Sequence, residues 1–72
     1  MKVRYFEDTD TLYIELRDGA VAETRDLDEN TLIDVDDRGR MVAITIEHAQ
    51  DRAELASFVY ERVEAQHAGV RS

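Results

Sequence analysis

The sequence contains no cysteine and no proline among its 72 residues. Without cysteine the chain forms neither disulfide bonds nor thiolate zinc sites, and this composition fits the reducing cytoplasm. No apolar run approaches the roughly 20 residues of a membrane-spanning helix, and Met1 to Tyr5 lead directly into a strand-like pattern without the apolar region of a signal peptide. We therefore expect a cytoplasmic protein that does not insert into a membrane.

Positively charged residues are also scarce in this sequence. Nine Lys and Arg stand against 17 Asp and Glu, which gives a formal net charge of −8. This charge repels phosphate backbones and anionic lipids, so we expect no direct nucleic-acid binding and no membrane-surface binding. The charge either keeps a small protein soluble or attracts a basic partner protein, and the sequence leaves both explanations open.

The chain is long enough for one domain only, and it lacks the repeats or low-complexity linkers that would mark an internal boundary. Domains of this size bury only about 60% of the surface that the unfolded chain exposes. Small proteins usually compensate for the cost of ordering the chain with disulfides, metals or self-association. We therefore predict a homodimer, with one domain over residues 1–67 and a frayed tail over residues 68–72.

Alternation of apolar and polar residues predicts a sheet of short antiparallel strands. In residues 11–17, Leu12, Ile14 and Leu16 fall on one side of the segment. Similar patterns, separated by polar or glycine-containing turns, predict strands over residues 2–6, 11–17, 20–26, 31–36 and 41–46. The polar third strand is expected at an edge of the sheet. The side chains expected to point inward from the last two strands are Ile33, Val35, Val42, Ile44 and Ile46.

From about Asp51 the spacing of the apolar residues changes. Leu55, Ala56, Val59 and Val63 recur at helical intervals, which predicts a C-terminal α-helix. Five strands followed by one helix do not form a βαβ unit, so the helix is expected to cover one face of the sheet. The predicted fold class is α+β, an antiparallel β-meander of about five short strands packed on one C-terminal α-helix.

The sheet face that this helix would leave uncovered is predicted to carry Tyr13, Leu32, Met41 and Ala43. Scattered apolar residues are common on a solvent-exposed face, but the same residues also suit a contact patch. Phe58 lies off the apolar stripe of the predicted helix and is free to anchor a partner, as aromatic residues often do. We therefore predict Tyr13, Leu32, Met41 and Phe58 as partner-binding residues.

The acidic segment from Asp26 to Asp37 is the candidate for ion binding. Residues 34–39 superficially resemble a calcium loop, but Arg38 falls at a ligand position and Thr45 replaces the bidentate carboxylate. A register that begins at Asp26 lacks the glycine of the sharp turn, because Thr31 stands in its place. A metal- or small-ligand-binding domain that uses this segment is the alternative function.

Residues suited to zinc binding or to covalent catalysis are few. His48 and His67 are the only histidines, and no cysteine completes a ligand set. Ser57 and Ser72 lie in no nucleophile elbow and at no recognisable spacing from a histidine. The primary prediction therefore includes no cofactor, no metal and no enzymatic activity.

Two segments resemble a known family. Residues 5–14 (Tyr-Phe-Glu-Asp-Thr-Asp-Thr-Leu-Tyr-Ile) and residues 33–49 are similar to the two blocks of the bacterial domain-of-unknown-function family 2283, over roughly residues 2–49. In the second block of that family an acidic turn with glycine leads into a Val-Gly-Ile-Glu-Ile-like strand, and here Ala43 and Thr45 replace its glycine and glutamate.

The resemblance implies a small β-rich domain with a C-terminal helix, and it implies no activity and no catalytic residues. Some relatives look like antitoxin partners of small toxins of the RelE/ParE type, which implies a basic, toxin-like partner. The leading prediction is a non-enzymatic protein-interaction domain, homodimeric and acidic, that binds such a partner. The ligand-binding domain is the alternative, and an enzyme is the third hypothesis.

Overall fold

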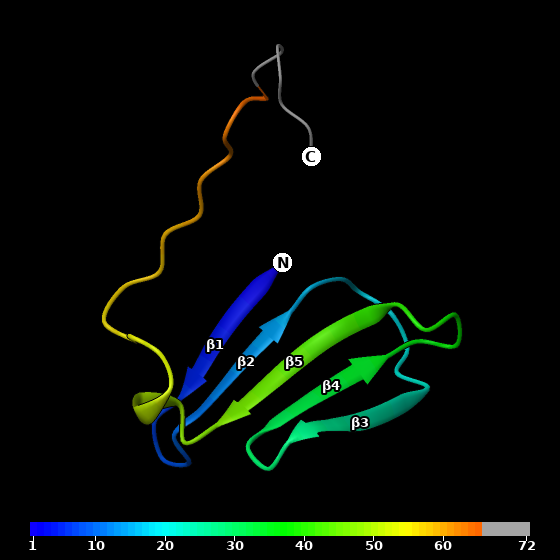
Figure 1. The fold of residues 1–72 in the computed structure, drawn as a ribbon, viewed down its shortest axis with the longest axis horizontal. Helices are drawn as coiled ribbons and strands as arrows, with labels where there is room; N and C mark the ends of the chain where they lie inside the picture. The colour runs from blue at the N-terminus through cyan, green and yellow to red at the C-terminus, as the bar shows by residue number, and fades with distance from the viewer. Residues whose placement is uncertain (66–72) are drawn as a thin grey trace.

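The computed structural model describes residues 1–65, which form one five-stranded antiparallel sheet (Figure 1). The elements are β1 (Lys2–Phe6), β2 (Thr11–Glu15), β3 (Glu23–Asp28), β4 (Thr31–Val35), β5 (Met41–Glu47) and a 3₁₀ turn, η1 (Ala49–Asp51). All five predicted strands are therefore present, although β3 begins and ends later along the chain than predicted.

The strand order β1-β2-β5-β4-β3 places the most apolar strand at the centre. β5 has the sequence Met-Val-Ala-Ile-Thr-Ile-Glu, whereas β3 is polar, fully exposed and at an edge, as predicted. The predicted meander is wrong, because β2 is followed in space by β5 and not by β3. The β1–β2 hairpin and the β4–β5 hairpin join where β2 pairs with β5. This pairing is favourable because it places apolar side chains of the two strands in contact.

Residues 16–22 carry the chain from β2 past the ends of β5 and β4 to the far edge (Figure 1). The Leu16 N–H donates to the Val42 carbonyl at 2.7 Å, and the Ala22 N–H donates to the Val35 carbonyl at 2.8 Å. These bonds hold the crossing segment against the sheet beside Val35 and Val42, both of which are buried.

The predicted C-terminal α-helix is absent from the described residues, and the α+β fold class is wrong. Beyond η1 the chain to residue 65 has no regular structure, so the described part of the chain is an all-β sheet. A helix of about 12 to 15 residues is marginal unless its apolar face packs, and the run Phe58-Val59-Tyr60 consists of weak helix formers. The predicted tail at residues 68–72 lies outside the described residues.

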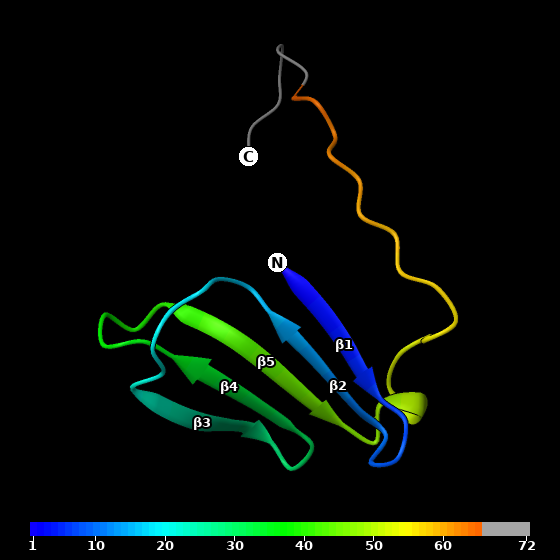
Figure 2. The same ribbon diagram turned by 180° about the vertical axis from the view of Figure 1, so that it is seen from behind.

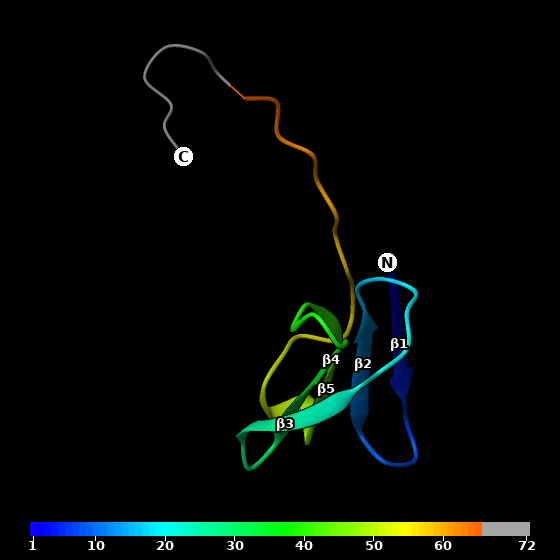
Figure 3. The ribbon, with the colours of Figure 1, turned by 90° about the vertical axis from the view of Figure 1, so that its right-hand side faces the viewer.

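The segment of residues 53–65 runs beside the sheet and covers neither face. Figures 1 and 2 show it outside the outline of the sheet from the front and from behind. Seen from the side in Figure 3, the strongly twisted sheet is a single layer. The described residues also contain no helix with the length and apolar character that crossing a bilayer requires.

The turn between β4 and β5 is organised by Asp36. Its Oδ1 accepts hydrogen bonds from the backbone N–H groups of Arg38 and Arg40, each at 2.9 Å, and its Oδ2 accepts one from Arg40 Nε at 2.9 Å. Gly39 supplies the positive φ of 79° that this turn requires. The hydrogen bond from the Arg40 backbone, together with the other bonds from Arg38 and Arg40, holds the pKa of Asp36 below its ordinary value.

Asp10 ties the β1–β2 turn to η1. Its carbonyl accepts the Ala49 N–H at 3.0 Å, and its Oδ1 accepts the Gln50 N–H at 3.1 Å and the Tyr5 hydroxyl at 2.7 Å. The hydrogen bond to Asp10 raises the pKa of Tyr5, because the phenol donates its proton to a carboxylate. Asp10 has a φ of 55°, a left-handed conformation that Asp tolerates better than most residues. Ala49 is fully buried as a result.

The Asp36 turn makes a testable contribution to stability that depends on pH. Because the folded pKa is lowered, the stabilisation is complete above the ordinary value of 3.8 and is lost as the pH falls through the folded pKa. We expect Asp36→Ala to lower the melting temperature at pH 7 and the difference from wild type to shrink below about pH 4. Asp37→Ala, at the exposed neighbouring position, is the control. A difference that stays constant down to pH 2 would contradict this explanation.

The contacts of Asp10 predict an order of stability among wild type, Asp10→Asn and Asp10→Ala. Asp10→Ala should destabilise the fold by about 2 kcal/mol, because it loses the side-chain hydrogen bonds and disfavours the left-handed backbone. Asp10→Asn should retain most of the stability, since Asn keeps an acceptor oxygen and tolerates positive φ. Chemical denaturation of the three proteins measures the order. Equal losses for Ala and Asn would show that the side-chain bonds do not hold η1 in place.

Candidate interaction surface

One face of the sheet is apolar from β1 to β4. Ile44 on the central strand stands opposite Ile14 on one side and opposite Ile33 on the other. Directly opposed residues of antiparallel strands point to the same side of the sheet, and residues two apart on one strand do so as well. The apolar face, defined in this way, consists of Val3, Tyr5, Leu12, Ile14, Ile33, Val35, Val42, Ile44 and Ile46. It contains all five residues that the sequence predicted to point inward.

Within residues 1–65 the apolar face is covered only in part: Val35 and Val42 are buried beside the crossing segment, and no second layer lies over the rest. Ile14, Ile33 and Ile44 are partly exposed, although Ile44 lies on the central strand. Within the described residues no large side chain is fully buried. Sequence reasoning missed this face as an interaction surface, because it assigned the predicted helix to cover it.

The opposite face, called the outer face below, carries two of the predicted partner-binding residues. Tyr13 and Leu32 both stand opposite Thr45, so they lie in one row across β2, β5 and β4. Both side chains are partly exposed. Ala43 was predicted to be exposed on this face, but it is fully buried, because it is small and lies between the side chains of Glu15 and Asp34.

Met41 is placed apart from that row by an irregularity in β5. The register shifts between Asp34 and Val35, so that Met41 stands opposite Val35, a residue of the apolar face. Together with Leu27 and Ile33, Met41 lines a shallow hollow of about 310 Å³. Met41 therefore belongs to the rim of the apolar face and not to the outer face that the alternation predicted.

Phe58, the fourth predicted residue, lies in the extended segment after η1. It is 64% exposed and lines an open hollow of about 550 Å³ with Met1, Val3 and Tyr60. Val59 and Val63 were predicted to be core residues of the helix, but they are 75% and 84% exposed because the segment does not pack on the sheet. Residues 58–63 thus expose a second, smaller set of apolar side chains.

Charge is distributed unequally between the two ends of the strands. The acidic end comprises residues 7–10, 28–30 and 47–52, which meet at the lower edge of the sheet in Figure 1 and contain seven Asp and Glu but one Arg. The arginine end comprises residues 16–18 and 36–40 and contains three Arg and three Asp. A basic partner of the kind predicted from the net charge would be attracted to the acidic end first.

The carboxylates of the acidic segment 26–37 do not converge on one point. Asp28 lies at the acidic end, where the hydrogen bond from the Asn30 N–H at 2.8 Å lowers the pKa of its carboxyl. Asp34 accepts a hydrogen bond from the Thr24 hydroxyl at 2.7 Å, and Asp36 lies in the turn at the arginine end. Within residues 1–65 no three His, Asp or Glu side chains are grouped as ligands of one ion.

His48 also has a local partner. Its Nδ1 lies 2.9 Å from the Asn30 side-chain oxygen, and it adopts a left-handed φ of 55° as the chain turns into η1. His67 lies outside the described residues. The hydrogen bond between the Glu47 N–H and the Asn30 carbonyl at 2.8 Å joins the same two loops. His48 therefore connects the end of β5 to the β3–β4 turn.

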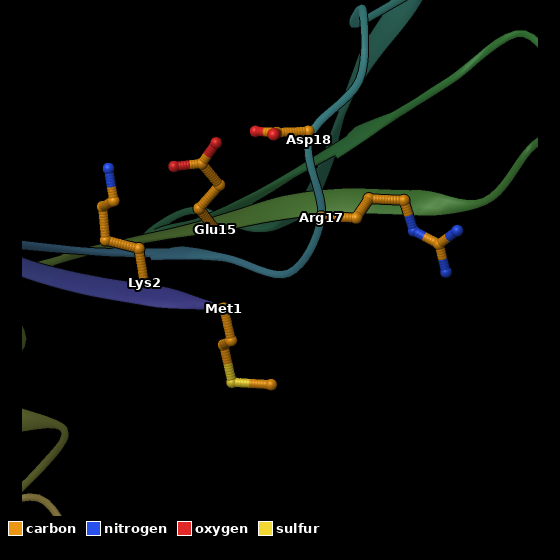
Figure 4. Close-up of a pocket in the computed structure, with 5 residues that line it drawn as sticks. All are labelled: Met1, Lys2, Glu15, Arg17 and Asp18. Atoms are coloured by element: carbon orange, nitrogen blue, oxygen red, sulfur yellow. The ribbon is translucent and has the colours of Figure 1, made fainter.

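A hollow of about 270 Å³ lies beside the start of β1. Figure 4 shows that Lys2, Glu15 and Asp18 extend to one side of the strands, whereas Met1 extends to the other. Lys2 and Glu15 are directly opposed on β1 and β2. The lining contains no histidine and no hydroxyl group, so it offers neither a general base of that type nor a serine-like nucleophile.

Comparison with known proteins gives one match. No curated protein and no solved structure matches the chain. The family described as "Protein of unknown function (DUF2283)" matches residues 2–50, which extend from β1 into η1. The match therefore includes the whole sheet and the residues that Asp10 holds, and it ends before the exposed segment 58–63. Because it covers more than half of the sequence, the chain belongs to the DUF2283 family of proteins of unknown function.

Proposed function

We propose that this protein is a non-enzymatic interaction domain that acts as a homodimer, in which each copy covers the apolar face of the other. The observation that carries this proposal is the apolar face itself, whose middle residues Ile14, Ile33 and Ile44 remain partly exposed because no second layer of residues 1–65 lies over them. Exposed apolar patches of several hundred Å² on small proteins typically mark interaction sites. A second copy presents the same patch, and two-fold symmetric dimers use one patch on both subunits.

The dimensions of the face suit a small symmetric dimer. The four strands that carry it, spaced by about 4.8 Å and each about 17 Å long, give a footprint of roughly 330 Å². At about 25 cal/mol per Å², burial of that footprint contributes roughly 8 kcal/mol from each copy, and association costs about 4 to 15 kcal/mol. The surplus supports a dimer, and it also provides the second layer that a single sheet lacks.

The exposed segment 58–63 would enlarge this interface. A standard interface buries about 800 Å² on each partner, and an aromatic side chain adds about 150 to 250 Å². Phe58 and Tyr60 lie beside Val3 at the margin of the apolar face. In the dimer these aromatic residues would contact the second copy where the sheet footprint ends.

A heterologous basic partner is the second part of the proposal. The concentration of seven carboxylates at the acidic end supports it, because such a field accelerates the approach of a cationic protein. The outer-face residues Tyr13 and Leu32 remain available for such a partner when the apolar face is occupied. An antitoxin-like role would require a basic, toxin-like protein at this surface. The metal- or ligand-binding alternative has less support, because the carboxylates of segment 26–37 are separated.

A pair of adjacent variants tests the proposed homodimer. Wild type should sediment as a dimer at micromolar concentration, and Ile33→Glu should weaken the dimer at least about 100-fold because it buries a charge in an apolar interface. Leu32→Glu introduces the same charge on the outer face and should leave the dimer intact. A wild-type protein that remains an 8.3 kDa monomer at all concentrations would contradict the proposal. Loss of the dimer in Leu32→Glu alone would place the interface on the outer face.

The Phe58→Ala variant distinguishes a contribution of Phe58 to dimer association from a contribution to folding of the monomer. Because Phe58 is 64% exposed in the single chain, we expect its removal to change the unfolding of a dilute monomer by less than about 0.5 kcal/mol. The same substitution should weaken the dimer by about tenfold or more, as for an aromatic anchor. Phe6→Ala, which removes a partly exposed aromatic from the outer face, is the control. Unfolding of the Phe58→Ala monomer would show that Phe58 belongs to the core.

A further inference from the structure

We propose that the two copies pack with their strands running in opposite directions, so that the acidic end of each copy lies over the arginine end of the other. This inference rests on the homodimer proposed above and specifies its geometry. It follows from the symmetry of a face-to-face dimer and from the unequal charge of the two ends.

If the strands of the two sheets are aligned, symmetry leaves two arrangements for two apolar faces in contact. A closed dimer has a two-fold axis, and a face-to-face contact places that axis in the plane between the sheets. An axis along the strands keeps like ends together, so that each acidic end faces the other. An axis across the strands places unlike ends together. Both arrangements keep the strands of the two sheets nearly aligned, as packed sheets prefer.

The charges favour the axis across the strands. Packed sheets lie about 10 Å apart, which is close to the screening length at 0.1 M salt, so charges on facing loops still interact. With like ends together, two ends that each carry seven carboxylates and one arginine, a net charge of −6, would face each other across this distance. With unlike ends together, the same carboxylates face three arginines and three aspartates, which carry no net charge.

The arginine end has side chains available for such contacts. Arg40 is bound to Asp36 at 2.9 Å, but Arg17 and Arg38 are exposed and form no ion pair within residues 1–65. At the acidic end, Glu29 is likewise exposed and has no ion pair among the described residues. These three side chains can therefore contact a second copy without breaking contacts in their own.

The strand order identifies one pair of oppositely charged residues that would meet between the two copies. An axis across the strands returns each strand to its own position in the order, so β4 of one copy lies over β4 of the other. Glu29 is in the turn before β4, and Arg38 is in the turn after it. Glu29 of each copy therefore lies near Arg38 of the other, whereas within one copy the two residues lie at opposite ends of β4.

A charge-reversal cycle tests this pair. We expect Arg38→Glu to weaken the dimer by roughly tenfold at 50 mM salt, measured by equilibrium sedimentation of the full chain. Addition of Glu29→Arg should restore the dissociation constant to within about threefold of wild type, because each reversed charge again faces its opposite. Circular dichroism confirms that each variant is folded. Arg4→Glu, the same charge change on the outer face of β1, is the control and should show no such coupling with Glu29→Arg.

The possible outcomes separate this inference from the homodimer on which it rests. Additive effects of the two reversals in a protein that remains dimeric would overturn the orientation and leave the dimer standing. A wild-type protein that is monomeric at every concentration would overturn both. Restoration of the dimer by the second reversal supports the orientation, because residues 29 and 38 are too far apart within one copy to interact.

Discussion

The antiparallel pairing of β5 with both β2 and β4 is the interaction on which the rest of the structure depends. β5 joins two hairpins that are separate in the sequence, and its register aligns Ile14, Ile44 and Ile33 on one side of the sheet. The same pairing leaves polar β3 at an edge, where its unpaired backbone groups are surrounded by charged side chains that oppose further strand addition. Without β5 in the centre there would be no continuous apolar face, and the loops that form the acidic end and the arginine end would not be brought together.

A single-layer sheet with one apolar face is incomplete by the usual rules of domain construction. Sheets bury such a face against helices or against a second sheet. Residues 1–65 supply neither, and η1 with Ala49 covers only a small part near Asp10. The proposed dimer meets this requirement by making two layers from two copies. In the proposed dimer, the exposed apolar side chains of Phe58, Val59, Tyr60 and Val63 would contact the second copy.

Strands and side-chain directions could be predicted from the sequence, because a period of two is visible over as few as five residues. Ile33, Val35 and Ile44 were assigned to the correct face for this reason. The order of the strands could not be read from the alternation, since that pattern does not identify which strands are neighbours. The helix was predicted from the spacing of Leu55, Val59 and Val63, but spacing alone does not fold a segment that lacks a packing partner.

The predicted interaction residues were likewise assigned to the correct face only where they lie in regular strands. Tyr13 and Leu32 were correctly assigned to one face because both lie in regular strands. Met41 was misplaced because a register shift follows Asp34, and no residue type marks that shift in the sequence. Ala43 was expected to be exposed, and its burial depends on neighbours from β2 and β4 that become adjacent only in the folded sheet. The charge asymmetry of the two ends likewise emerges only when three distant loops meet.

Intermolecular contacts between methyl groups provide the most direct test of the proposed homodimer. A sample made from equal parts of isotopically labelled and unlabelled protein can be examined by filtered nuclear Overhauser spectroscopy, which detects only contacts between copies. We expect intermolecular contacts from Ile14, Ile33 and Ile44 and none from outer-face Leu32. If the methyl groups of the apolar face instead contact only residues 53–65 of their own chain, the face is covered within one copy, and the proposed dimer is contradicted.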